Sequence, residues 1–417
     1  MSAVDADVSR RSPLRRALAA PRFRRLFLAR TLSRWGDVFS AVALVVLVYR
    51  LTGSGFKVGA TAMFEIVPVL AFGFVAGAVV DRFPRVRVMV VSDLGRGALA
   101  LSLVVLHDHL WAVYAIAFAT AALSTFFTPA AVSIVPSLVD REEDLLGANA
   151  VLTSSAIVSQ IVLAPLAGAL VAFAGPGPAF AVNAASFFVS AALLSRLHVA
   201  AAAPRPARSP YLADVREGLL LIRHSPLLRG LAQVQALAAL SAGATSALLV
   251  VLAEGHLHVG PDRFGLLLMA IAAGQGLGPL VLQRFVHDAR RPGLLFGPLL
   301  VRGMVDLVLV SSTTFGVAFA ALAVYGLATN TGGVTFNTLL QQSVVDRTRG
   351  RVFAFFDMVW QAGRLTSIAA GGILADRLGV GGVYVAAGVL LLGAGVLGYL
   401  TVPSAAMRPA GPADGRP

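Results

Sequence analysis

Cysteine is absent from the 417 residues, which excludes disulfides, thiolate metal sites and a cysteine nucleophile. Charge is scarce, because only 13% of the residues are charged whereas 57% are hydrophobic. Soluble proteins contain roughly half apolar and a quarter charged residues, so an ordinary soluble fold is excluded as well. The sequence also lacks a Walker loop and a His-Glu-x-x-His motif, which argues against a built-in ATPase and a zinc hydrolase.

Long apolar runs dominate what is present, and short polar breaks separate them. A helix of about 20 apolar residues crosses roughly 30 Å of hydrocarbon. Helices are expected because lipid offers no partners to backbone polar groups, and the runs lack the alternation of barrel strands. Twelve transmembrane helices are predicted, near residues 24–50, 57–80, 86–106, 110–132, 148–173, 178–199, 227–253, 263–286, 293–312, 315–341, 351–375 and 380–402.

Basic residues outnumber acidic ones by 34 to 21, which gives a net charge of +13. Such an excess also occurs in nucleic-acid-binding proteins, but its distribution here fits a membrane protein. With both termini in the cytoplasm, about 25 basic residues fall on the inside and about 4 outside, as the positive-inside rule requires. We therefore expect a multi-pass protein of the cytoplasmic membrane, whose partner is the lipid bilayer rather than nucleic acid. The almost exclusive use of arginine over lysine indicates a bacterial source.

The predicted helices divide into two halves joined by one long cytoplasmic connection. In that connection Leu212, Val215, Leu219 and Ile222 recur at helical spacing, which predicts an amphipathic helix at the membrane surface. A faint repeat relates the halves, because the SLVDR sequence that ends at Arg141 is echoed by SVVDR in the second half. The predicted parts are a cytoplasmic N-terminal segment (1–23), a six-helix bundle (24–199), a cytoplasmic linker with the amphipathic helix (200–225), a second six-helix bundle (226–402) and a cytoplasmic tail (403–417).

A short segment between the second and third predicted helices carries a recognisable motif. Gly77 is followed by the pair Asp81-Arg82 and then by Arg85 and Arg87. This pattern resembles the loop motif of major facilitator superfamily transporters, and the resemblance extends over nearly the whole chain. It implies an all-α membrane protein with twelve transmembrane helices in two pseudo-symmetric six-helix bundles, which transports by alternating access, needs no cofactor and acts as a monomer.

Further matches are similar to one branch of this superfamily, the transmembrane secretion effectors, which include enterobactin exporters and macrolide-efflux proteins. The matches include Asp37 after Trp35-Gly36, and the run from Arg349 to Val352. Pro165 and Gly168 lie in a stretch similar to an antiporter motif of the fifth helix. The branch implies proton-coupled efflux of a moderately large organic compound, such as a drug, a macrolide or a siderophore.

Two departures from the family pattern keep other functions open. The fourth predicted helix, 111–132, contains no arginine, whereas many proton-coupled drug exporters of the superfamily carry one there. Residues 283–291 of the second half lack an acid at the position that matches Asp81. A small-metabolite importer or uniporter of the same fold is therefore an alternative, and so is a receptor or scaffold that does not transport.

Ionisable residues inside predicted helices are candidates for function, because a charge within the bilayer is costly. Arg30, Arg34 and Asp37 share one face of the first helix, and Glu65 in the second helix is expected at a depth comparable to that of Asp37. Two neighbouring carboxylates in a low dielectric cannot both ionise cheaply, which predicts a proton site. We expect Asp37, Glu65 and Arg34 to couple protons or bind substrate; a structural salt bridge between Asp37 and Arg34 is the alternative.

The family resemblance also implies a conformational latch on the cytoplasmic side. In the family, the loop acid faces the start of the eleventh helix, where the helix dipole favours an anion. Carried over to this chain, Asp81 caps that helix, Arg82 or Arg85 reaches Asp357, and Gly77 completes the motif. A segment that only anchors positive charge in the cytoplasm is the alternative.

Two charged pairs lie at matching places in the two halves, Asp93 with Arg96 and Arg302 with Asp306. Their spacings of three and four residues suit an ion pair within one helix. The family resemblance places both helices at the outside of the bundle. We therefore expect self-paired structural bridges there.

The remaining candidates concern packing and the transport pathway. Pro165 with Gly168 predicts either a hinge or close helix packing, and Gly274 lies in a glycine-rich stretch for which close packing is expected. The polar side chains expected to line a pathway are Gln160, Gln233, Asn330, Asn337 and Gln361.

No metal site and no enzymatic site are expected. The histidines of two short outer segments, at 107, 109, 256 and 258, are of the exposed kind that usually has no ligand role. No nucleophile or paired catalytic group stands out, so an enzyme is the least favoured interpretation.

Overall fold

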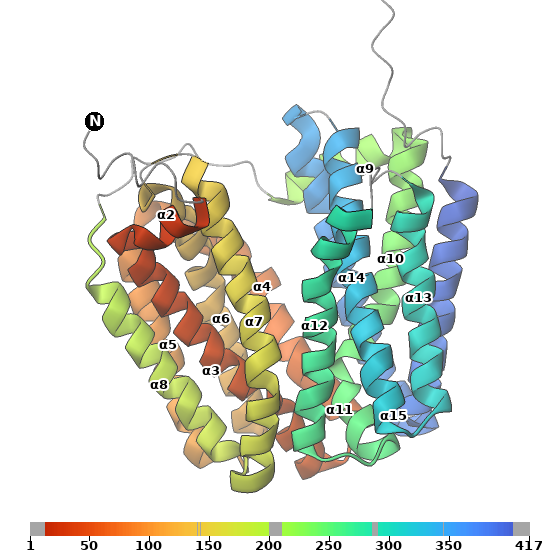
Figure 1. The fold of residues 1–417 in the computed structure, drawn as a ribbon, viewed down its shortest axis with the longest axis horizontal. Coiled ribbons are helices and arrows are strands. Elements are labelled where there is room, and N and C mark those ends of the chain that lie inside the picture. The colour runs from red at the N-terminus through yellow and green to blue at the C-terminus, as the bar shows by residue number, and fades with distance from the viewer. Residues whose placement is uncertain are drawn as a thin grey trace, which may run out of the picture. The chain divides into compact units, whose positions relative to one another are not determined.

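The computed structural model describes residues 13–139, 141, 143–199, 211–285, 291–344 and 346–402, and the regular elements in these ranges are all helical (Figure 1). Parts of the predicted N-terminal segment and linker (1–12 and 200–210) and the predicted tail lie outside them. The elements are α2 (Pro13–Ala19), α3 (Pro21–Thr52), α4 (Gly55–Arg82), α5 (Arg85–Leu106), α6 (Leu110–Ser133), η1 (Val135–Ser137), α7 (Glu143–Ala174), α8 (Pro176–Ser195), α9 (Tyr211–His224), α10 (Pro226–Ala247), α11 (Leu249–Val251), η2 (Leu252–His256), α12 (Pro261–Phe285), α13 (Pro292–Ser311), α14 (Phe315–Ser343) and α15 (Asp346–Thr401).

Ten helices of the described chain are long and apolar enough to cross a membrane. α10 and the stretch Leu249–His256 together form an eleventh candidate span, which is bent by 50° at the break between them. α15 is interrupted at Gly379, whose φ of 78° and ψ of 158° are not helical, so this element contains two successive helices. Each of the twelve predicted segments therefore overlaps a helical stretch.

The loop between the second and third spans is shorter than the sequence predicts. α4 continues through Arg82 and α5 begins at Arg85, so only Phe83 and Pro84 connect them. Proline lacks an N–H and disfavours a helical conformation in the preceding residue, which accounts for the break at this point. Most of the motif therefore lies on helix ends.

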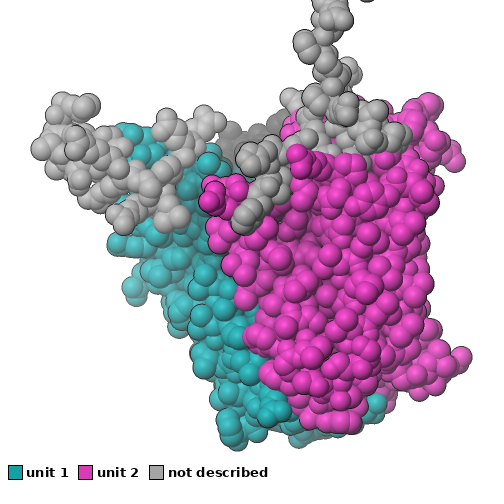
Figure 2. All heavy atoms as spheres, turned by 45° about the vertical axis from the view of Figure 1, so that its right-hand side comes forward, with its two compact units in different colours: residues 1–53, 61–207, 260–269 teal, residues 54–60, 208–259, 270–417 magenta. Residues whose placement is uncertain are grey.

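Two compact units make up the structure (Figure 2). Unit 1 comprises residues 1–53, 61–207 and 260–269, and unit 2 comprises residues 54–60, 208–259 and 270–417. The first residues of α4 belong to unit 2, and the first residues of α12 belong to unit 1. These two helices each begin in one unit and continue in the other.

Each unit has its own apolar core. Large side chains buried in the core of unit 1 are Phe23, Leu26, Met89, Phe127, Ile134 and Leu194. Those buried in the core of unit 2 are Leu231, Phe296, Leu340, Val352, Phe356 and Val402. Many other apolar side chains remain exposed, among them Phe173 and Leu400, as expected for helices that face lipid.

Each unit also has a short helix that an ion pair anchors to a long one. In unit 1 the Nε of Arg16 on α2 lies 2.8 Å from Oδ1 of Asp144 on α7. In unit 2 the Nη1 of Arg351 on α15 lies 2.7 Å from Oε2 of Glu217 on α9. α9 occupies the place of the amphipathic helix expected in the linker.

Candidate functional site

Unit 1 contains a cavity of about 780 Å³. Five charged side chains line it: Arg30, Arg34 and Asp37 from α3, Glu65 from α4 and Arg96 from α5. The three α3 residues reach one cavity because their spacing places them on one face of the helix. Asp37 and Glu65, for which the sequence predicts a comparable depth, both line this cavity.

The other helices around this cavity contribute polar, uncharged side chains alongside apolar ones. α6 supplies Thr120, Ser124 and Thr128, α7 supplies Asn149, and α8 supplies Asn183. The α6 hydroxyls are already bonded within their own helix: Ser124 donates to the carbonyl of Thr120 at 2.9 Å, and Thr128 to that of Ser124 at 3.0 Å. All the charge that lines the cavity therefore comes from the first three long helices of unit 1.

Asp37 is half-buried, and within the described chain it forms no ion pair, with Arg34 or with another residue. The positive charges of Arg96 and Arg34 act on its carboxylate from a greater distance. The salt bridge to Arg34, the alternative raised by the sequence, is absent from this conformation. A carboxylate that is exposed to a cavity and not tied to a cation is available for a proton or for a substrate.

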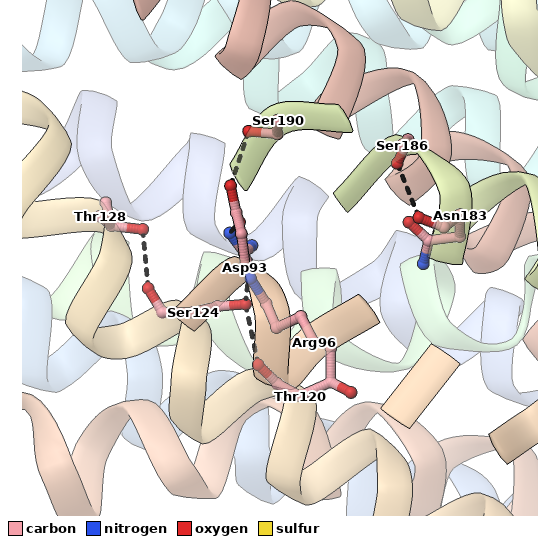
Figure 3. A network of polar contacts seen from close by, with 8 residues as sticks. All are labelled: Asp93, Arg96, Thr120, Ser124, Thr128, Asn183, Ser186 and Ser190. Carbon is pink, nitrogen blue, oxygen red and sulfur yellow. Dashed lines mark hydrogen bonds and ion pairs between the residues drawn. The ribbon is translucent and has the colours of Figure 1, made fainter. Parts of the chain in front are cut away.

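Arg96 belongs to a buried polar cluster that joins α5 to α6 and α8 (Figure 3). Its guanidinium pairs with the Asp93 carboxylate and donates from Nη1 to the Ser124 hydroxyl at 3.3 Å. The Ser190 hydroxyl donates to Oδ2 of Asp93 at 2.6 Å. The self-paired bridge predicted for Asp93 and Arg96 is confirmed.

The pair lies buried between neighbouring helices. Asp93 is 0% and Arg96 4% exposed, and the guanidinium carbon lies 4.4 Å from the ring centres of both Phe127 and Phe187. α5 turns its charged face toward α6 and α8 because that face cannot be turned toward lipid. Arg96 was thus missed as a cavity residue. The sequence offered one signal for the position of Arg96. α6 has no arginine of its own, and Arg96 of α5 places a guanidinium beside that helix.

The matching pair in unit 2 is built differently. Nη2 of Arg302 donates to the Tyr325 hydroxyl at 2.9 Å, and its guanidinium carbon lies 4.8 Å from the centre of the same ring. Asp306 is 1% exposed, and its Oδ2 has no hydrogen-bond partner among the described residues. The bridge predicted between Arg302 and Asp306 is not formed, because the guanidinium turns to Tyr325 instead.

Unit 2 contains a second cavity, of about 410 Å³, between α10, α13, α14 and α15. Its aromatic lining consists of Phe296, Phe336, Phe353, Phe356 and Trp360. Polar groups are few, and they are Gln235, Arg302, Thr329, Asn337 and Asp357. An apolar and partly aromatic wall with a few polar groups is typical of sites for partly apolar organic molecules.

The predicted pathway residues are placed unevenly. Asn337 lines the cavity of unit 2. The other four, Gln160, Gln233, Asn330 and Gln361, are not among the residues that line either cavity. Asn330 instead packs against Gly278 of α12. Spacing along the sequence could not show which face of each helix borders a cavity.

The latch residues are divided between the units. Gly77, Asp81 and Arg82 lie exposed in the last turns of α4 in unit 1, whereas Asp357 belongs to α15 in unit 2. Nη1 of Arg85 donates to the carbonyl of Ser133 at the end of α6, at 3.1 Å. The latch itself stays a prediction.

Glycines bring two pairs of helices into backbone contact. A Cβ atom on Gly168 of α7 would collide with the carbonyl of Pro261 in α12, and one on Gly265 would collide with that of Ala164. In unit 2, Gly274 of α12 and Gly326 of α14 approach each other's helix in the same way. Close packing at Gly168 is therefore observed, and a hinge there stays a prediction.

The comparison with protein families decides the assignment of the chain. A model of the transmembrane secretion effectors matches residues 9–410. The chain belongs to the transmembrane secretion effector family. It is similar to the uncharacterized MFS-type transporter YfiS of Bacillus subtilis, with 25% identity over 392 residues that cover 89% of this chain and 91% of that protein. It is also similar to the enterobactin exporter EntS of Citrobacter koseri, with 27% identity over 368 residues that cover 86% of this chain and 85% of that protein.

Solved structures show the same fold at low sequence identity. The nucleoside transporter NupG matches with a TM-score of 0.73 and 12% identity, over 93% of this chain and 99% of that one. A bacterial homologue of the iron transporter ferroportin, in an inward-facing state, matches with a TM-score of 0.69 and 18% identity, over 91% of this chain and 98% of that one. The transmembrane secretion effector is thus an all-helical, multi-pass membrane transporter of the major facilitator fold, and it belongs to a family of transporters rather than enzymes.

Proposed function

We propose that this transmembrane secretion effector exports a moderately large, partly apolar organic compound from the cytoplasm by alternating access, driven by the proton gradient. It does so as a monomer in the bacterial cytoplasmic membrane, with both termini inside. The similarity to proteins named enterobactin exporters favours export and a compound of the drug, macrolide or siderophore type.

The charged cavity of unit 1 is the observation that carries the proposal. Asp37 and Glu65 both line it, and within the described chain Asp37 forms no ion pair that would keep it charged. Proton and substrate then act on the same two-state equilibrium, because a ligand shifts a conformational equilibrium only through its different affinities for the two states. Protonation of Asp37, in the cavity that Glu65 also lines, is the step that ties export to the proton gradient.

The aromatic cavity of unit 2 supports a partly apolar substrate. Its rings offer faces and edges on which apolar and aromatic groups pack, and the Phe336 and Phe356 rings already meet edge to face with centres 5.4 Å apart. Asn337 and Gln235 add amide groups that orient a ligand by hydrogen bonds.

Accumulation of test compounds in an efflux-deficient bacterial host tests the proposal. The panel contains fluorescent drugs, macrolides and labelled siderophores, and cells express wild type, Asp37→Asn or the control Asp108→Asn, with and without a protonophore. We expect wild type and Asp108→Asn to lower accumulation of at least one compound, and Asp37→Asn or the protonophore to abolish the effect. Asp108 is a suitable control because its side chain is 73% exposed and it does not line the cavity.

Two outcomes would overturn parts of the proposal. Export at the wild-type rate by Asp37→Asn, with the protonophore still effective, would move the proton site away from Asp37. No change in accumulation of any compound, with the protein confirmed in the membrane, would favour a small-metabolite carrier or a protein that does not transport. Flux of solutes in reconstituted vesicles separates these two.

We also propose that the cytoplasmic ends of α4 and α15 form the latch that the family pattern implies. Arg85 already bonds the end of α6, so Arg82 is the arginine that we pair with Asp357, and Asp81 caps the start of α15. Asp81→Asn should slow transport of an exported compound several-fold without weakening its binding, because the latch acts on the conformational change. Loss of binding in this variant, measured on purified protein, would contradict the latch.

A further inference from the structure

A carboxylate from a distant part of the chain caps the first turn of α4. The Ser54 hydroxyl donates to Oδ2 of Asp376 at 2.6 Å, and the backbone N–H of Gly55 donates to Oδ1 at 2.6 Å. The N–H of Phe56 adds a longer bond of 3.4 Å to Oδ2. All these residues belong to unit 2, whereas α4 from Thr61 onward belongs to unit 1.

The bonds satisfy groups that a helix leaves open at its start. The first N–H groups of a helix have no intrahelical acceptor, and the helix dipole makes this end attractive to an anion. Ser54 precedes the helix and accepts from the Lys57 N–H at 3.3 Å, as a local cap does. Asp376 adds charge-assisted bonds from another helix, and these tie the beginning of α4 to α15.

Glycines allow the two helices to meet at this point. A Cβ atom on Gly55 would lie 2.8 Å from that of Ala375, and one on Gly372 would lie 2.7 Å from the Cα of Phe56. On the next turn of α4, a Cβ on Gly59 would lie 3.2 Å from Cγ2 of Ile368. The Asp376 carboxylate thus bonds α4 to α15 at a point where the two backbones are already in contact.

The sequence around Asp376 repeats the motif at the other end of α4. Residues 372–377 read Gly-x-x-x-Asp-Arg, as do residues 77–82. Asp81 stands near the end of α4, and Asp376 stands shortly before Gly379, where the first helical part of α15 ends. The start of α4 and the end of this part of α15 are thus joined by the second copy of the motif.

We propose that Asp376 is a positioning residue of the transport cycle, whose cap holds the start of α4 on α15 and must break when the outer side of the transporter opens. The proposal rests on the alternating-access cycle and the membrane orientation proposed above, which place Ser54 and Asp376 on the outer side. Two copies of one motif then act at opposite ends of the same helix.

The absence of cysteine gives a clean test, because one engineered thiol is the only one present. Ser40→Cys places a thiol on the wall of the unit 1 cavity. Its rate of labelling by a membrane-impermeant maleimide, added outside intact cells, measures how often the outer side is open. Asp376→Ala on this background should raise the rate roughly tenfold, equivalent to about 1.4 kcal/mol in the opening equilibrium.

Two further variants sharpen the result. Asp376→Asn keeps one acceptor oxygen and loses the charge, so its labelling rate should lie between those of wild type and Asp376→Ala. Asp262→Asn removes an acid from the first turn of α12, which begins in unit 1, and should leave the rate unchanged. If Asp376→Ala fails to fold, Ser54→Ala removes one of the three bonds and should still raise the rate measurably.

An unchanged or lower labelling rate in a folded Asp376→Ala protein would overturn the proposal. A lower melting temperature with no change in labelling would assign Asp376 a structural role alone. The measurement requires neither substrate nor a proton gradient, so it gives a result even if no compound is exported. Failure of the proposed function and failure of this inference are therefore distinguishable.

Discussion

Units 1 and 2 share a succession of elements, from a short anchored helix to the long helices that follow, but their interiors differ. In unit 1 the acid of α5 is paired with Arg96 and accepts from Ser190. In unit 2 the acid of α13, Asp306, has an oxygen without a hydrogen-bond partner among the described residues, while Arg302 bonds Tyr325. A repeated arrangement of helices therefore does not impose a repeated arrangement of charge.

The linings of the two cavities also differ. The larger one, in unit 1, is lined by five charged side chains, whereas the one in unit 2 is lined by five aromatic rings. A charged wall suits ions and polar groups, and an aromatic wall suits apolar groups. The difference fits the proposed function, which places the coupling proton in unit 1 and the apolar part of a substrate in unit 2.

The largest difference that we expect between the units is in the unfolding free energy lost when Asp93 or Asp306 is replaced. Asp93→Asn should lower the free energy of unfolding by about 3–5 kcal/mol, because it leaves the Arg96 guanidinium buried without its counter-charge. Asp306→Asn should change it by less than about 1 kcal/mol, since Oδ2 has no hydrogen bond to lose. Thermal or denaturant unfolding of the purified variants in detergent measures both. Equal losses would show that the two acids are held in the same way.

A smaller effect concerns the groups that hold each arginine. Tyr325→Phe keeps the ring but removes the acceptor of Arg302, so we expect a loss of about 1.5–3 kcal/mol in unfolding free energy. Phe187→Leu removes one of two rings that stack on Arg96 and leaves its ion pair intact, so the stacking lost is about 0.5–2 kcal/mol. A larger loss from Phe187→Leu would mean that stacking, rather than the ion pair, holds Arg96.

The smallest effect concerns the short helices. Arg16→Gln breaks an ion pair whose side chains are 11% and 8% exposed and should cost about 1 kcal/mol. Glu217→Gln breaks one whose side chains are 50% and 37% exposed and should cost no more than a few tenths of a kcal/mol. Added salt should reduce the stability loss caused by Glu217→Gln and hardly affect the loss caused by Arg16→Gln. A Glu217→Gln loss that exceeds that of Arg16→Gln would reverse this ranking.

The fold was expected from the family resemblance, and the membrane spans were predictable from the sequence because length and apolarity set them. The face shared by Arg30, Arg34 and Asp37 was predictable for a similar reason, since helical spacing fixes which side chains lie on one side. The exact ends of the helices were less accessible, because α4 continues through Arg82 into the segment expected to be a loop. The break at Gly379, by contrast, falls in the predicted gap between residues 375 and 380.

What each helix faces could not be read from its own sequence. The bridge between Asp93 and Arg96 was predictable from their spacing within α5, but its burial against α6 and α8 was not, and Arg302 was expected to bond Asp306 but bonds Tyr325 of α14. Local spacing describes one helix, whereas these partners stand on others. The repeat of the Gly-x-x-x-Asp-Arg motif at 372–377 was visible in the sequence and gained its meaning only from the contact of Asp376 with α4.

The close contact between α12 and α14 at their glycines limits how the protein can deform. At Gly274 and Gly326 each backbone touches the other so closely that even a methyl group would collide with a carbonyl oxygen. Sliding one helix past the other would drive neighbouring side chains into these carbonyls, and separating them would open a gap that nothing fills. Within unit 2 these two helices therefore move together as one rigid pair, and any hinge of the unit must lie elsewhere along the chain.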